Sequence, residues 1–177
     1  MKRIYPIIPT IILTLASFTA WFAHAVFGCE RFAYQAGSSL PDFLLFHFYH
    51  ANIFHLLGNL FALWLFRPRT STVLISYLIA TLAAYIDSLI PINLTPHILY
   101  LQPQTLSTCG LSAVLFASFA RYYVSWRKPI YPILIPVVIT AFIPYINWHI
   151  HLIAFLLSYL AFLPIYRLNI RYKLLFM

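Results

Sequence analysis

Long apolar stretches separated by short basic segments restrict what this chain can fold into. One stretch, FLLFHFYHANIFHLLGNLFALWLF, is long enough to cross a bilayer, since a helix needs about 20 residues to span the hydrocarbon. Only 8% of the residues are charged and 63% are hydrophobic, so the chain cannot present an ordinary soluble surface. The sequence therefore predicts an all-α polytopic membrane protein.

Six membrane-spanning helices are expected from the apolar runs and from the proline and basic residues that separate them. Residues 28–45 are expected to form a loop, and residues 1–177 a single transmembrane domain. The expected spans are 5–27, 46–66, 72–91, 108–125, 129–146 and 148–167.

The basic residues predict the orientation, because short loops rich in Lys and Arg stay on the cytoplasmic side. With six spans and both termini cytoplasmic, ten of the eleven Lys and Arg residues lie on that side, and only Arg31 lies opposite. The formal charge of +8 is thus distributed between spans and not gathered on a soluble face. This distribution of charge predicts that the chain interacts with a lipid bilayer and does not bind nucleic acid.

The start of the chain imitates a cleavable signal peptide with an A-x-A site at Ala23-His24-Ala25. Its apolar stretch is longer than a normal signal core and contains Pro6 and Pro9. We therefore expect it to be retained as the first span.

The two cysteines, Cys29 and Cys109, permit at most one disulfide bond. Burial of both as small apolar side chains is the alternative that we favour. A framework of several disulfides is excluded.

Polar side chains on three expected spans lie at similar depths. Counted from the basic residues at the cytoplasmic ends, Ser112 and His151 are each about 22–24 Å above the inner boundary of the core. His55 is about 18 Å and His50 about 25 Å above it by the same rule. These groups are therefore expected to converge in the outer half of the bilayer.

Two histidines compete on the last span, His149 and His151. Ala154 and Ser158 share the helix face of His151, because they follow it at i+3 and i+7. A face of small residues lets another helix approach closely, and a similar face adjoins Ser112 on the fourth span. Close packing of the two spans would bring Ser112 and His151 within hydrogen-bond reach.

A serine hydroxyl becomes a good nucleophile when a base removes its proton, and histidine suits that task. The three acidic residues of the chain lie in expected loops or at helix ends. They are Glu30, Asp42 and Asp87. The expected catalytic unit is therefore a dyad of Ser112 and His151, without a carboxylate.

Four further residues fit such a dyad. Phe116, one turn after Ser112, is placed to stack on the imidazole. His55 and Asn59 share one helix face and are candidate donors to an oxyanion, together with the Ser112 N–H. Gly110 suits a helix start at which the backbone stays open to substrate or water.

Three motifs follow one another on the second, fourth and sixth spans: His50-x4-His55-x3-Asn59, Gly110-Leu111-Ser112-Ala113, and His151 ahead of Ala154 and Ser158. In this order and over essentially the whole chain, they resemble the rhomboid family of intramembrane serine proteases. The resemblance implies a Ser112 nucleophile, a His151 general base and an oxyanion site helped by His55 and Asn59. It also implies a water-filled cavity open to the outer side, with no metal and no cofactor.

The implied activity is endoproteolysis within or beside the transmembrane segments of other membrane proteins. The implied location is a bacterial inner (plasma) membrane. His50 matches the family's leading histidine, with a structural or substrate-facing role. No residue pattern specifies the substrate or the oligomeric state.

The sequence departs from the family pattern at several positions. Ala113 replaces the usual Gly after the serine, Ala154 and Ser158 replace a common glycine pair, and Phe116 replaces a frequent Tyr. The Trp-Arg pair of the first outer loop is missing, which leaves the subgroup open.

Several alternatives stay open beside the protease. A catalytically inactive relative would bind membrane proteins without cutting them, and a relative that processes C-terminal sorting tails fits the same residues. A transporter would have polar residues through both leaflets. A metal site at His47 and His50 is a further alternative, but no acidic or thiolate ligand accompanies these two histidines. The remaining histidines are interpreted as interfacial or loop residues, namely His24, His47, His97 and His149.

Overall fold

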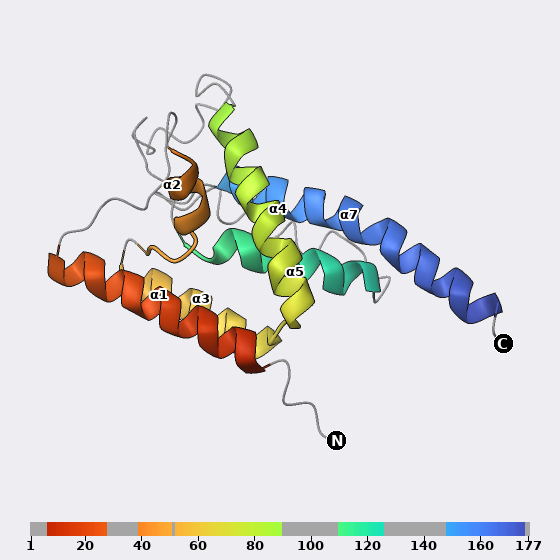
Figure 1. The fold of residues 1–177 in the computed structure, drawn as a ribbon, viewed down its shortest axis with the longest axis horizontal. Coiled ribbons are helices and arrows are strands. Elements are labelled where there is room, and N and C mark those ends of the chain that lie inside the picture. The colour runs from red at the N-terminus through yellow and green to blue at the C-terminus, as the bar shows by residue number, and fades with distance from the viewer. Residues whose placement is uncertain (1–6, 28–38, 51, 90–109, 126–147, 176–177) are drawn as a thin grey trace.

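A computed structural model describes residues 7–27, 39–50, 52–89, 110–125 and 148–175 (Figure 1). Over these residues the chain is helical without strands, which confirms the all-α prediction for this part. The helices are α1 (Ile7–Phe27), α2 (Leu40–Leu45), α3 (Ile53–Phe66), α4 (Thr70–Leu89), α5 (Ser112–Ser125) and α7 (Trp148–Leu175). The expected span 129–146, Glu30, Arg31 and both cysteines lie outside the described residues.

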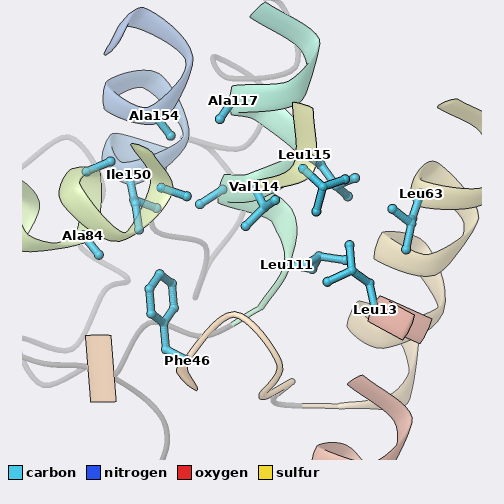
Figure 2. Packing of buried hydrophobic residues seen from close by; sticks show 14 of the residues in the cluster. Leu13, Phe46, Leu63, Ala84, Leu111, Val114, Leu115, Ala117, Ile150 and Ala154 are labelled. Atoms are coloured by element: carbon cyan, nitrogen blue, oxygen red, sulfur yellow. The ribbon is translucent and has the colours of Figure 1, made fainter. Parts of the chain in front are cut away.

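Helix α5 packs against α7, α4 and α3, and α1 packs along α3 (Figure 1). Ala117 of α5 and Ala154 of α7 are fully buried, and both belong to one apolar core (Figure 2). Small side chains at this contact allow the two helix backbones to approach closely. The predicted packing of these two small-residue faces is confirmed.

Helix α4 is long and apolar enough to cross a membrane, with a mean hydropathy of 1.6, and it is the only such helix among the described residues. Shorter apolar helical stretches cover Ile7–Ala23, Ile53–Phe66 and Trp148–Pro164. The count of six spans therefore stays a prediction.

The second expected span, 46–66, is wrong at its start, because α3 begins only at Ile53. The Asn52 side chain accepts the His55 N–H at 2.9 Å and caps the helix there. An Asn cap of this kind stabilises a helix start by about 1 kcal/mol. Residues 46–48 form a turn instead, and residues 49–50 have no regular secondary structure, so His50 does not lie on the helix as expected.

The expected loop 28–45 contains helix α2 at its end, which the apolar pattern did not predict. Ser39 precedes α2, and both its N–H and its hydroxyl donate to Asp42 Oδ2, at 2.8 and 2.7 Å. Pro41 lies in the first turn, where its missing N–H costs nothing. This local capping signal was present in the sequence.

Three other boundaries differ from the predicted ones, and the smallest difference is at α4, which begins at Thr70 and not at residue 72. Helix α5 begins at Ser112 and not at residue 108, because Gly110 has a φ of 110°, which no α-helix accommodates. Helix α7 continues past residue 167 to Leu175, with Pro164 inside it.

Candidate active site

Ser112 and His151 form the centre of the candidate site. Ser112 is the first residue of α5, and His151 lies in the first turn of α7. The Ser112 Oγ and His151 Nε2 atoms are 2.8 Å apart, so the predicted hydrogen-bond reach is confirmed. Deeper between the same helices, the Ser158 hydroxyl donates to the Ala117 carbonyl at 2.6 Å. This second contact helps to fix the spacing on which the Ser112–His151 pair depends.

The His151 ring is held by an aromatic neighbour. Phe116 stacks on it with ring centroids 4.7 Å apart and an interplanar angle of 16°, as predicted. His151 is buried, whereas His149 is half-buried with its ring against Trp148. His151 Nδ1 has no hydrogen-bond partner within the described part of the chain. Within this part of the chain, no third polar group therefore joins the Ser112–His151 pair through Nδ1.

The start of α5 supplies backbone donors beside the serine. The first backbone hydrogen bond of this helix runs from the Leu115 N–H to the Leu111 carbonyl, at 3.1 Å. The N–H groups of Ser112, Ala113 and Val114 precede it and have no acceptor within the helix. Together with the positive end of the helix dipole, they favour negative charge at the serine.

His50 lies fully buried in the stretch before α3, next to Gly110 and Leu111, which directly precede Ser112 and are hereafter called the serine loop. Its Nδ1 is 3.1 Å from the Phe48 carbonyl, which only an Nδ1–H can satisfy. Its Nε2 then accepts from the Asn59 amide at 3.0 Å and faces the Leu111 N–H at 3.5 Å. These contacts favour a structural role for His50.

His55 and Asn59 pack against the backbone that precedes Ser112. A Cβ on Gly110 would lie 2.6 Å from His55 Cε1, 2.7 Å from His55 Nε2 and 3.3 Å from Asn59 Nδ2. The His50 and His55 rings meet edge to face, with centroids 5.0 Å apart. The structure therefore brings these two helix residues, His50 and Gly110 together beside the serine.

His47 lies in a turn, in agreement with the loop interpretation, but it is not exposed at an interface. His47 is fully buried, and its Nε2 is 3.1 Å from Thr81 Oγ1 of α4. Its apolar neighbours Phe46 and Phe48 fit either environment, so the sequence held no signal for burial.

No group of three or more potential metal ligands occurs among the described residues.

A family model described as "Rhomboid domain" matches residues 38–167, which is more than half of the chain. The matched range contains every residue of the candidate site, from His50 to Ser158. No curated protein matches the chain.

Proposed function

Because this chain belongs to the rhomboid family, and is therefore an integral membrane protein, we propose that it is an intramembrane serine endopeptidase. Members of this family generally are serine proteases that act on transmembrane substrates in the bilayer. The observation that carries the proposal is the 2.8 Å contact between Ser112 Oγ and His151 Nε2. Catalytically inactive relatives commonly lack one of these two side chains.

In the proposed reaction, Ser112 Oγ attacks the carbonyl carbon of a substrate peptide bond while His151 Nε2 takes the hydroxyl proton. The carbonyl oxygen becomes an oxyanion, for which the Ser112 N–H and the side chains of His55 and Asn59 are the proposed donors. The C–N bond then breaks, and His151 returns its proton to the leaving amine. Water, activated by the same histidine, hydrolyses the acyl-serine to a carboxylate and free Ser112.

The proposed topology has six spans in one domain, with both termini cytoplasmic and the site open to the outer side of a plasma membrane. Its support is the distribution of basic residues, ten of eleven of which lie on one side in this arrangement. The length and composition of α4 are consistent with a span.

The direct test uses detergent-solubilised protein and a panel of single-span membrane substrates, with Ser112→Ala as the matched control. Cleavage by the wild type that Ser112→Ala lacks supports the proposal. Labelling of Ser112 by a fluorophosphonate, which reacts with activated serines, tests the nucleophile without a protein substrate. A wild type that neither cleaves nor labels would instead be an inactive binding relative.

Replacing Asn59 by Ala is expected to slow turnover about tenfold to a thousandfold, the usual contribution of one oxyanion donor, with KM nearly unchanged. The variant also removes the amide bonded to His50. Its melting temperature should therefore be measured beside kcat and KM. An unchanged kcat would leave Asn59 with a packing role only.

Cleavage is expected within about two turns of the outer end of a substrate's span, because the proposed dyad lies in the outer half of the bilayer. A helical peptide bond is shielded by its own hydrogen bonds, so the substrate must unwind locally. Gly or Pro near the cut lowers that cost by about 1 or 3 kcal/mol respectively. Mass spectrometry of the product termini locates the cut. Cuts near the cytoplasmic end of the substrate's span would contradict the topology. Equal rates for a substrate whose outer stretch is rewritten with Leu and Ala would contradict it as well.

A further inference from the structure

We propose that His47, through its hydrogen bond to Thr81, is a positioning residue for Ser112. It ties residues 44–50, hereafter the 44–50 segment, to α4, and this segment in turn holds the backbone immediately before the serine. The inference rests on the proposed peptidase function.

One end of the 44–50 segment is attached to the middle of α4. Thr81 Oγ1 donates its single proton to the Tyr77 carbonyl at 3.0 Å, so it accepts the bond from His47 Nε2–H at 3.1 Å. The Tyr77 hydroxyl also donates to the Leu44 carbonyl. The rings of His47 and Phe48 both contact the Tyr77 ring, with centroids 4.8 and 6.0 Å away. Two hydrogen bonds and two ring contacts therefore hold the segment on α4.

The other side of the segment supports the serine loop. The Phe46 carbonyl accepts the Gly110 N–H at 2.9 Å, and His50 Nε2 faces the Leu111 N–H at 3.5 Å. Both residues that directly precede Ser112 thus donate toward the 44–50 segment. The Phe46 side chain is fully buried and points toward Ala84 and Ile150 (Figure 2).

The position of this segment depends on such contacts because residues 46–50 are not helical. A helix holds its backbone by its own hydrogen bonds, whereas an irregular buried stretch needs partners from other elements. His47 follows Phe46 directly, so a shift of His47 moves the carbonyl that holds Gly110. A displacement of about 1 Å at a reacting group costs about 100-fold in rate.

The test removes the Thr81 hydroxyl and keeps the side-chain shape. Thr81→Val is expected to lower kcat, and the rate of fluorophosphonate labelling of Ser112, by about tenfold, with KM unchanged. Thr81→Ser restores the hydroxyl and is expected to keep near wild-type rates. His47→Leu, which lacks the ring donor, is expected to behave like Thr81→Val.

Thr14→Val is the matched control. The Thr14 hydroxyl donates to the Thr10 carbonyl at 2.7 Å and accepts the Trp64 Nε1–H at 3.0 Å, so it repeats the Thr81 arrangement between α1 and α3. Both threonines are half-buried, and neither of these two Thr14 hydrogen bonds reaches the serine loop. Its loss is expected to change the melting temperature as much as Thr81→Val does, but not the labelling rate.

The outcomes separate this inference from the proposed function. Wild type that labels at Ser112, with Thr81→Val slow and Thr14→Val normal, supports the positioning role. Wild-type labelling with Thr81→Val at the same rate, or with both Val variants equally slow, overturns that role and leaves the peptidase proposal intact. Wild type that does not label overturns the proposed function, and the positioning role with it.

Discussion

Replacing Ser112 or His151 by Ala is expected to reduce proteolysis by about 10⁴-fold or more, since each change removes half of a two-residue unit. Loss of the serine leaves no nucleophile, and loss of the histidine leaves its proton without an acceptor. The measurement is the initial rate of cleavage of a single-span substrate in proteoliposomes, with the melting temperature of each variant. Ser112→Ala removes one oxygen atom, whereas His151→Ala leaves a cavity beside Phe116, so the serine variant is the cleaner of the two.

His149→Ala is the control for this experiment. The His149 ring packs on Trp148, and His149 is only half-buried, whereas His151 faces the serine. Proteolysis by His149→Ala is expected to remain close to the wild-type rate. Loss of activity in His149→Ala with activity kept in His151→Ala would show that His149 is the base.

Replacing Gly110 by Ala is expected to reduce proteolysis by about 100-fold, because the change displaces both the serine loop and the His55 ring. The φ of 110° at this position is rarely adopted by a residue with a side chain, which costs about 1–3 kcal/mol. The new methyl carbon would also lie 2.6 Å from the His55 ring, so that ring must move. Cleavage rate and fluorophosphonate labelling of Ser112 measure the effect together.

Gly58→Ala provides the matched glycine control. Gly58 lies in α3, one residue before Asn59, and a Cβ there meets nothing within 4 Å. Ala is favoured over Gly inside a helix by about 0.5–1 kcal/mol, so this variant is expected to be active and no less stable than the wild type. Equal loss of activity in both glycine variants would mean that the conformation of Gly110 is not the cause.

The helical class, the family and the set of candidate residues could be predicted from the sequence, because each depends on local spacing. Apolar length predicts helices, and a period of 3.6 residues separates the face of His151 from that of His149. Small residues beside Ser112 and His151 predicted their contact without knowledge of the rest of the fold. The start of α2 also has a local sequence signal, since Ser39 and Asp42 form a capping pair that hydropathy does not reveal.

The positions of His47 and His50 were decided only by the tertiary structure. A histidine in an apolar stretch has the same neighbours in sequence whether it faces lipid, water or another helix, and only its contacts across the fold distinguish these cases. Thr81 lies 34 residues from His47, and Leu111 lies 61 residues from His50. Spacing along one helix determined which residues share a face. The hydrogen bonds between distant segments determined how the backbone around Ser112 is held, because they form only after the helices have packed.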